Sequence, residues 1–347
     1  MNGLRVPAPL RPGDTIAVTA PSSGVEPALH PRLDLILADW RARGWRVEEG
    51  TCLRDERGSA SAPAAERAAE LMRFLLRDDI AAIVPPWGGE LAVEILDRLD
   101  WTALAGARPK WLLGYSDTST WLLPVTLRLG WATAHGPCLM DLAPAQPDPL
   151  TRGALDILSR GPGDSFEQRQ SERWQSQWTD FATEPACIHR LTETTSWRAL
   201  DGRDRVAMQG RLIGGCLDTL LHVAGSPHGD VSGFVSRAAG DGAILFLENS
   251  DLSPVGIVRA LHALRWAGWL DGLAGLLIGR SNGRDGEGAS QLRSADALSA
   301  TLAGAPYPIL VDTDIGHLPP QLVLVNGARA EVSWSSDGGG RIVQHLD

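Results

Sequence analysis

The chain has 347 residues, of which 44% are hydrophobic, enough for a buried core in each of two domains. Its formal net charge of −10 argues against nucleic acid or an anionic membrane surface as a partner, because both attract proteins with a basic face. Its scattered cysteines and histidines predict no metal site. Its lack of an apolar run long enough to span a membrane and its first eleven residues, which do not resemble a secretory signal, predict a cytoplasmic protein.

The first half of the chain alternates expected strands with expected helices. Apolar runs that end at glycine or proline predict the strands, and apolar residues at helical spacing predict the helices. This alternation predicts an α/β fold with a mostly parallel sheet and helices on both faces. The strands are expected at 15–20, 80–84 and 111–113, and the helices at 33–43, 64–77 and 118–129.

The texture changes between residues 161 and 205, which are rich in Ser, Gln, Thr and Arg. Trp174, Trp178 and Trp197 lie among these polar residues. Three large aromatic side chains argue against a disordered segment. We therefore expect a crossing between domains that carries a long, functional loop.

Regular structure resumes after this crossing. A helix is expected from Ser253-Pro254 to Trp266, because serine is a good N-cap and proline a good first helical residue. Asn326-Gly327 predicts a hairpin between the last two strands. The strands of this half are expected at 243–247, 273–278, 309–311, 322–325 and 330–334.

Ser116 lies in the turn Gly114-Tyr115-Ser116-Asp117-Thr118, between an expected strand and an expected helix. Backbone N–H groups at the start of that helix can stabilise an oxyanion beside the hydroxyl, as in a nucleophile elbow. A serine here is also a common helix N-cap, and Thr118 stands where the usual elbow has its last glycine. Taken alone, the segment favours the cap.

Other polar features follow expected strands. The segment PPWGGE at 85–90 opens the backbone so that N–H groups can approach a ligand, although an ordinary turn has the same pattern. Glu248 follows a very apolar strand, so its carboxylate is suited to orient a histidine unless it belongs to a solvated acidic turn with Asp251. His317 has the pKa range of a general base, although a single loop histidine is more often a surface residue.

Six ordered segments of this chain resemble the LD-carboxypeptidase family, which includes muramoyl-tetrapeptide carboxypeptidases and microcin C immunity peptidases. The resemblance extends from about Pro12 to Val332 and reverses the preference for a cap at Ser116. The segments are APSSG (20–24), PPWGGE (85–90), GYSDTS (114–119), GRLIGGCLDTL (210–220), FLENSD (246–251) and DIGHLPPQLVLVNG (314–327).

The resemblance implies a serine peptidase that needs no cofactor. It implies Ser116 as nucleophile, Glu248 as acid and His317 as base, with the N–H groups of Gly89 and Asp117 as the oxyanion hole. The chemistry agrees with these residue types, because amide hydrolysis without a metal needs an activated nucleophile, an oriented base and an oxyanion site.

The resemblance also implies the domain organisation. A Rossmann-like N-terminal domain with a parallel sheet would carry the nucleophile, and a smaller mixed β/α C-terminal domain would carry the acid and the base. We place these domains at 1–165 and 206–347, joined at 166–205 by the crossing with its Trp-rich loop. Members of the family are commonly homodimers, so a homodimer is expected.

Four further residues are candidates for substrate binding. Trp87 and Gly88 lie in the glycine-rich segment. Cys216 stands where many relatives have asparagine, near the substrate side, although a buried small hydrophobe is the simpler interpretation. Arg280 either clamps a substrate carboxylate or is an ordinary arginine at the end of a strand.

The tryptophans of the crossing favour the microcin branch of the family, in which an aromatic residue of this loop stacks on a nucleobase. That branch cleaves the bond joining aspartate to a modified adenylate. The expected substrate is therefore a small peptide or an aminoacyl-nucleotide, and Trp174, Trp178 and Trp197 are candidates to contact it. Two alternatives stay open: removal of D-alanine from a cell-wall tetrapeptide, and a non-catalytic module that binds small molecules.

Overall fold

The computed structural model describes residues 3–146, 148–285 and 291–347. The apolar strands of the first half form a six-stranded sheet in the order β14-β5-β4-β3-β1-β2. Its first five strands in the sequence run parallel, and β14 is antiparallel to β5. The strands are β1 (Thr15–Val18), β2 (Arg46–Glu49), β3 (Ile80–Ile83), β4 (Trp111–Gly114), β5 (Thr133–His135) and β14 (Leu324–Asn326).

Helices cover both faces of this sheet. Alternate residues of each strand point to opposite sides, and because these residues are apolar, both faces are buried against helices. Ile16 and Val18 pack in one core cluster with α1, whereas Ala17 packs in another cluster with α2 and α4. The helices are α1 (His30–Ala42), α2 (Ala64–Leu76), α3 (Trp101–Gly106) and α4 (Ser119–Leu129), with 3-10 turns η1 (Pro27–Leu29), η2 (Ala92–Arg98), η3 (Ser116–Thr118) and η4 (Leu139–Asp141).

The second sheet has eight strands in the order β6-β16-β15-β10-β11-β12-β13-β9. Strands β10 to β13 are parallel, and antiparallel strands extend the sheet on both sides. These strands are β6 (Ser165–Arg169), β9 (Arg198–Ala199), β10 (Arg205–Cys216), β11 (Ala243–Glu248), β12 (Gly275–Gly279), β13 (Ile309–Thr313), β15 (Arg329–Ser335) and β16 (Gly339–His345). Parallel strands in both sheets confirm the predicted mixed α/β class.

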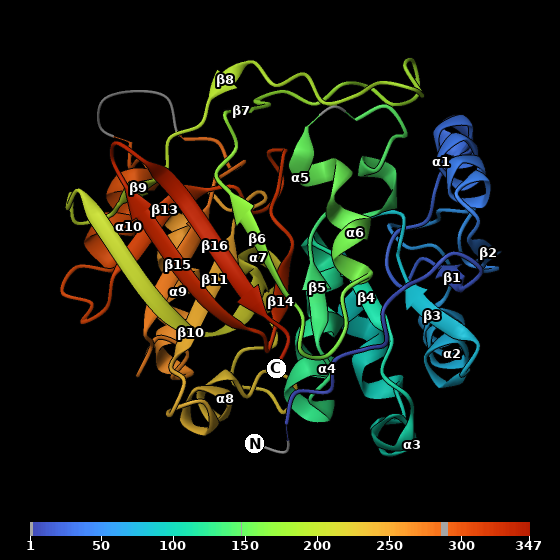
Figure 1. Cartoon of the computed structure of the whole chain (residues 1–347), viewed down its shortest axis with the longest axis horizontal. Helices are drawn as coiled ribbons and strands as arrows, with labels where there is room; N and C mark the ends of the chain where they lie inside the picture. The colour runs from blue at the N-terminus through green and yellow to red at the C-terminus, as the bar shows by residue number, and fades with distance from the viewer. Residues whose placement is uncertain (1–2, 147, 286–290) are drawn as a thin grey trace.

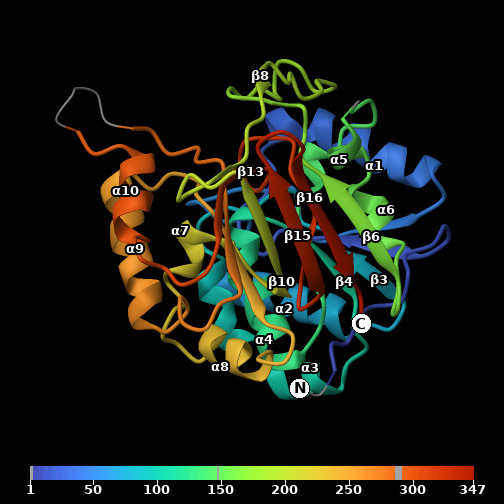
Figure 2. The ribbon, with the colours of Figure 1, turned by 60° about the vertical axis from the view of Figure 1, so that its left-hand side comes forward.

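The remaining helices lie around the second sheet and at its junction with the first, and Figure 2 shows α9 and α10 side by side on its outer flank. The expected start of α9 is confirmed, since the Ser253 side chain accepts a hydrogen bond from the Gly256 N–H. These helices are α5 (Pro149–Arg152), α6 (Ala154–Leu158), α7 (Leu217–Leu220), α8 (Val231–Arg237), α9 (Pro254–Trp266) and α10 (Ser294–Thr301).

The expected hairpin at Asn326-Gly327 is wrong. Strand β14 pairs with β5 in the first sheet, whereas β15 pairs with β10 and β16 in the second. Gly327 does adopt the left-handed region, with φ of 89°, but the chain leaves one sheet for the other at this turn. The hairpin that forms joins β15 to β16.

The crossing between the halves is more regular than the sequence suggested. It supplies β6 and β9, which are the strands at opposite edges of the second sheet. Between them lies the Trp-rich insert, residues 170–197, in which β7 (Arg173–Trp174) pairs with β8 (Glu193–Thr194). The insert runs across the top of Figure 1 towards α1, where Arg32 donates to the carbonyl oxygens of Pro185 and Cys187 at 3.0 Å.

The sheets do not divide the chain strictly by sequence, because β14 comes from the last quarter of the chain and completes the first sheet. The predicted domain limits at 165 and 206 stay a prediction.

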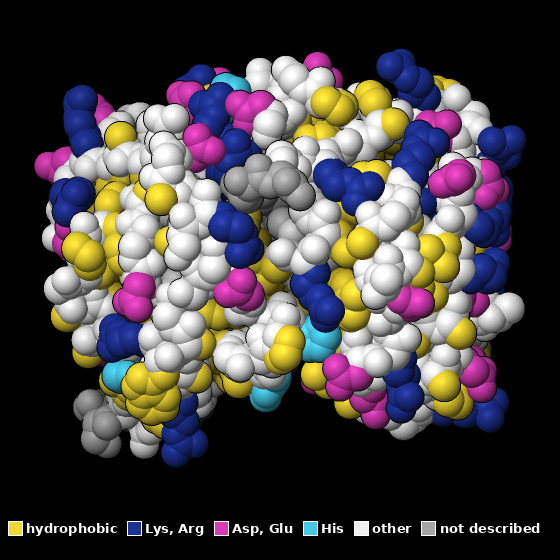
Figure 3. All heavy atoms as spheres, turned by 90° about the horizontal axis from the view of Figure 1, so that it is seen from below, with side chains coloured by type: hydrophobic (Ala, Val, Ile, Leu, Met, Phe, Trp, Pro, Cys, Tyr) yellow, Lys and Arg dark blue, Asp and Glu magenta, His cyan; other side chains and the backbone are white. Residues whose placement is uncertain are grey.

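Within the described parts of the chain, no helix combines the length and the apolar character that a membrane crossing needs. On the face seen in Figure 3, acidic and basic side chains lie interspersed.

Candidate active site

Three side chains from distant parts of the sequence form one hydrogen-bonded relay. His317 Nε2 lies 3.0 Å from Ser116 Oγ, and His317 Nδ1 lies 2.7 Å from Glu248 Oε2. Ser116 lies two residues after the end of β4, Glu248 ends β11, and His317 lies in the loop after β13. All three therefore lie at or beyond the carboxyl ends of parallel strands, where open α/β sheets bind their ligands.

The backbone at Ser116 is strained. Its φ of 60° is rare for a residue with a side chain and marks a sharp turn between β4 and η3. The N-cap residue of α4 is Thr118, and Ser116 directs its hydroxyl to His317. The strained turn therefore presents the hydroxyl to the imidazole, as a nucleophile elbow does.

The glycine pair of the PPWGGE segment lies against this turn. A Cβ atom on Gly88 would come within 2.7 Å of both the Asp117 backbone nitrogen and Ser116 Oγ. Gly89 has φ of 133°, and a Cβ there would collide with the hydroxyl of Ser22. Only glycine lets this backbone approach the serine so closely. The N–H groups of Gly89 and Asp117 are thus carried by segments in contact with Ser116.

The carboxylate of Asp117 holds the other side of this arrangement. It is buried and accepts hydrogen bonds from Ser22 Oγ at 2.6 Å, from the Ala92 N–H at 2.8 Å and from Thr120 Oγ1 at 2.7 Å. These bonds fix Asp117, and with it the direction of its backbone N–H. Ser22 was not among the predicted site residues, although it is the third residue of the APSSG motif at 20–24.

Burial and charge act in opposite directions on the acid and the base. Burial alone would raise the pKa of Glu248, but the charge and hydrogen bond of His317, with smaller contributions from His135 and Cys216, together lower the pKa of that carboxyl. Burial alone would lower the pKa of His317, but the charge and hydrogen bond of Glu248, with smaller contributions from Asp218 and Asp141, together raise the pKa of the imidazole. Each group therefore stabilises the charged form of the other, as an acid that supports a developing imidazolium should.

Cys216 lies in this site and is not merely part of the core. It ends β10, where it is the register partner of Glu248 on the adjacent parallel strand β11. Ligand atoms of Cys216, Glu248 and His317 all lie within 4.8 Å of one another. The backbone N–H of Cys216 donates to Ser119 Oγ at 3.0 Å, which ties β10 to α4. Sequence spacing missed this group because its members are far apart in the chain.

Arg280 is not placed to clamp a substrate carboxylate. It is buried, forms an ion pair with Asp314, and donates through Nη2 to the carbonyl oxygens of Leu318 at 2.7 Å and Pro320 at 2.8 Å. These partners lie on both sides of His317 in the chain. Its guanidinium therefore holds the loop that carries the base.

The Trp-rich insert holds the same loop from the outside. Asp314 accepts from the N–H and the hydroxyl of Ser171 at 2.9 and 2.6 Å, and from Trp197 Nε1 at 2.9 Å. The N–H of Gln175 donates to the Pro319 carbonyl oxygen at 2.8 Å. We call this set, together with Arg280, the His317 clamp. No local pattern of residues indicates this clamp, apart from Asp314 in the DIGHLPPQLVLVNG motif.

The four candidate tryptophans differ in their surroundings. Trp197 is buried and engaged with Asp314, and half-buried Trp87 donates to the Gly24 carbonyl oxygen at 2.9 Å. Trp174 is half-buried, with its ring centre 5.5 Å from the Arg280 guanidinium carbon. Trp178 is 40% exposed. Trp174 and Trp178 are thus the two tryptophans of the insert that are not buried.

Several carboxylates lie near Glu90, the residue that follows Gly89. Partial burial and the nearby charges of Asp117, Asp251 and Asp218 raise the pKa of Glu90. Asp218 accepts from the N–H groups of Ser250, Asp251 and Leu252 at 2.7 to 3.1 Å, and so fixes the loop after Glu248. Sequence analysis did not single out Asp218.

Comparison with known proteins agrees with this geometry. The LD-carboxypeptidase N-terminal domain model matches residues 16–136, and the LD-carboxypeptidase C-terminal domain model matches residues 209–332. The chain is 26% identical to the microcin C7 self-immunity protein MccF of Escherichia coli, over 98% of this chain and 96% of that protein. It is 28% identical to a probable murein peptide carboxypeptidase of Bacillus subtilis, over 94% and 91% of the two chains.

Solved structures show the same fold. The structure of MccF in complex with aspartyl sulfamoyl adenosine superimposes with a TM-score of 0.81, at 25% identity, over 97% of this chain and 98% of that one. The match spans both sheets and the insert between them.

Proposed function

Because this chain belongs to the LD-carboxypeptidase family of serine peptidases, we propose that it hydrolyses an amide at the C-terminal end of a small peptide or an aminoacyl-nucleotide. The observation that carries the proposal is the unbroken relay from Ser116 through His317 to Glu248. A module that only binds small molecules has no need of a strained serine hydrogen-bonded to an oriented imidazole.

In the proposed mechanism, His317 Nε2 accepts the Ser116 proton as the serine oxygen attacks the carbonyl carbon. Glu248 stabilises the imidazolium that forms, and the N–H groups of Gly89 and Asp117 hold the oxyanion. The imidazolium then donates its proton to the leaving nitrogen. Water attacks the acyl-enzyme with His317 again as base, which releases the acid and restores Ser116.

We favour an aminoacyl-nucleotide as substrate. The related MccF has been solved with aspartyl sulfamoyl adenosine, and the insert here carries two tryptophans that are not buried, Trp174 and Trp178. A murein peptide is the second candidate, because the Bacillus subtilis relative is a probable murein peptide carboxypeptidase. Side-by-side hydrolysis of aspartyl sulfamoyl adenosine and a muramoyl tetrapeptide decides between them. Faster trimming of the tetrapeptide would exclude the favoured substrate.

Stacking on the insert makes a sharper prediction. Trp174→Ala or Trp178→Ala should lower kcat/KM for the nucleotide substrate by an amount worth about 1–3 kcal/mol. The loss should disappear on an analogue without the base, because only stacking depends on the base. Trp266→Ala is the matched control, since Trp266 lies on α9 and is 82% exposed. Equal losses on both substrates would indicate general damage to the insert.

We also propose that the protein is a cytoplasmic homodimer that confers self-immunity or resistance to a peptide-nucleotide antibiotic. Light scattering of the purified chain tests the dimer, and survival of cells that express wild-type or Ser116→Ala protein tests the resistance.

A further inference from the structure

The end of β10 places a thiol beside the catalytic acid. Cys216 and Glu248 are register partners on adjacent parallel strands, so their side chains leave the sheet on the same side. Both residues are buried, and Glu248 Oε1 has no hydrogen-bond partner among the described residues. The Cys216 thiol has a weak contact with Asp218 Oδ2 at 3.6 Å. Glu248 Oε1 thus lies next to the Cys216 thiol, and burial together with this carboxylate raises the pKa of the thiol, so that only a bound cation would favour the thiolate.

His317 completes a set of three possible metal ligands. A sulfur, a carboxylate oxygen and a ring nitrogen of this set lie within 4.8 Å of one another. Zinc takes this combination of ligands in tetrahedral sites, with bond lengths of about 2.0–2.3 Å, and leaves a fourth position for water.

We propose that Cys216, Glu248 and His317 form an inhibitory site for a thiophilic divalent cation of the Zn²⁺ class. When the cation binds, the thiol proton leaves to solvent, and the proton shared by His317 Nδ1 and Glu248 moves to Nε2 if Nδ1 is the ligand. The thiolate and the carboxylate then balance the two positive charges, which satisfies the rule that buried charges be paired. No electron is transferred.

Such binding stops hydrolysis because the relay uses both ring nitrogens of His317. Nδ1 faces Glu248 and Nε2 faces Ser116, so coordination of either nitrogen breaks one link. This inhibition rests on the proposed function, whereas binding of the cation does not. The expected effect of metal on the rate of hydrolysis is opposite to that in a metallopeptidase. A chelator preserves or raises the activity, and zinc lowers it.

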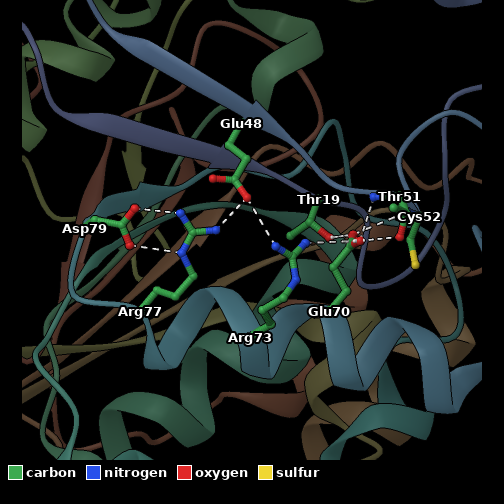
Figure 4. A network of polar contacts seen from close by, with 8 residues as sticks. All are labelled: Thr19, Glu48, Thr51, Cys52, Glu70, Arg73, Arg77 and Asp79. Atoms are coloured by element: carbon green, nitrogen blue, oxygen red, sulfur yellow. Dashed lines mark hydrogen bonds and ion pairs between the residues drawn. The ribbon is translucent and has the colours of Figure 1, made fainter.

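A second buried thiol in this chain provides a matched control. Cys52 also lies beside a carboxylate, that of Glu70, but without a histidine in that group (Figure 4). Both Glu70 oxygens already accept hydrogen bonds, from Thr19 Oγ1 at 2.5 Å and from the hydroxyl of Thr51 at 2.7 Å. Removal of Cys52 should therefore leave metal binding unchanged.

The test uses the full chain, stripped with EDTA and dialysed. Calorimetry with Zn²⁺ should give one site per chain, and Co²⁺ should give a thiolate-to-cobalt charge-transfer band. Cys216→Asn should abolish the band and weaken Zn²⁺ binding at least tenfold, whereas Cys52→Ser should not. Cys187→Ser controls for the half-buried thiol on the insert. Hydrolysis by wild type should fall at least tenfold at saturating Zn²⁺ and return with EDTA.

Each outcome bears on one claim. A charge-transfer band that persists in folded Cys216→Asn overturns the site. If that variant does not fold, Glu248→Gln and His317→Ala must each weaken Zn²⁺ binding, and unchanged affinity in both overturns the site as well. Zn²⁺ bound at Cys216 without loss of hydrolysis overturns the inhibition alone. If no amide substrate is cleaved, the proposed function fails while the calorimetry still decides the site.

Discussion

At the scale of single residues, strain and hydrogen bonding converge on Ser116. A φ of 60° costs free energy of about 1–3 kcal/mol at a residue with a side chain, so the fold must hold the turn in place. Gly88 packs on one side of the turn, and buried Asp117 anchors the other. Backbone strain of this kind is typical of functional sites, where the position of a side chain is maintained at a cost in stability.

Replacement of this serine tests its role as nucleophile. Ser116→Ala should lower kcat by at least about 10³-fold, because the attacking oxygen is lost while the rest of the site stays. The thermal unfolding temperature should change little, since alanine keeps the Cβ and the turn. Near-wild-type hydrolysis by a folded Ser116→Ala protein would rule out the mechanism.

The raised pKa of His317 predicts a pH profile. The base must be neutral to act, so kcat/KM should fall as pH drops through the His317 pKa, which lies above its ordinary value of about 6.5. Glu248→Gln removes the charge that raises this pKa, so the fall should move to lower pH. Its maximal rate should drop by roughly 10⁴-fold.

Asp251→Asn is the control for this profile, because Asp251 is an exposed carboxylate three residues from Glu248. It should leave the profile close to that of wild type. If the pH profile shifts with Asp251→Asn and not with Glu248→Gln, then Asp251 and not Glu248 is the acid.

At the scale of elements, the His317 clamp links three segments. Arg280 at the end of β12 and Ser171 and Trp197 at the two ends of the Trp-rich insert all donate to Asp314, three residues before His317. The insert thus has a structural role apart from any contact with substrate. Trp197, considered as a substrate contact from its sequence, has its indole N–H engaged in this clamp.

Asp314→Asn tests the clamp. Loss of the charge that Arg280 faces in the core should cost about 3–5 kcal/mol of unfolding free energy, because a buried ion pair is broken. In the folded fraction, kcat should fall more than KM rises, since the base is displaced while the substrate surface stays. Ser171→Ala, which removes one donor, should show the same trend with a smaller loss of stability.

Asp312→Asn provides the matched control on the same segment. Asp312 pairs with Arg198 at 2.6 Å, but both side chains are more than 40% exposed, so little stability should be lost. Equal effects of Asp312→Asn and Asp314→Asn on kcat, measured by steady-state kinetics, would contradict a specific clamp.

At the scale of the whole molecule, the two sheets are completed by strands from outside their own half. β14 completes the first sheet after the chain has built most of the second, and the crossing supplies β6 and β9 to the edges of the second. The proposed catalytic residues come from both halves: Ser116 follows strand β4 of the first sheet, Glu248 ends strand β11 of the second, and His317 follows strand β13 of the second. Folding of the halves and formation of the relay are therefore expected to be coupled.

Division of the chain tests this coupling. A fragment of residues 1–165 lacks β14, and a fragment of residues 206–347 lacks β6 and β9, so each should expose unpaired sheet edges. We expect neither fragment to show a cooperative thermal transition in circular dichroism, whereas the full chain should. A stable, cooperative 1–165 fragment would instead support independent domains with the predicted limits.

Local patterns in the sequence were enough to locate several strands and helices, because these elements depend mainly on residues close together in the chain. The apolar runs placed β3, β4 and β11, and helical spacing with a serine cap placed α9. Six ordered motifs identified the family and named Ser116, Glu248 and His317 as residues to examine. These features follow from local propensity and from segments that can be compared directly with related proteins.

Only the tertiary structure decided how distant segments meet. Asn326-Gly327 is a dipeptide typical of hairpins, but β14 pairs with β5 in the first sheet and β15 pairs with β10 in the second. The sequence context of Arg280 fits a substrate clamp or an ordinary arginine at the end of a strand, yet its buried partners come from residues 314 to 320. Cys216 comes to lie beside Glu248 only through the register of β10 on β11. Strand pairing, register and burial depend on long-range contacts, which a local pattern of residues does not encode.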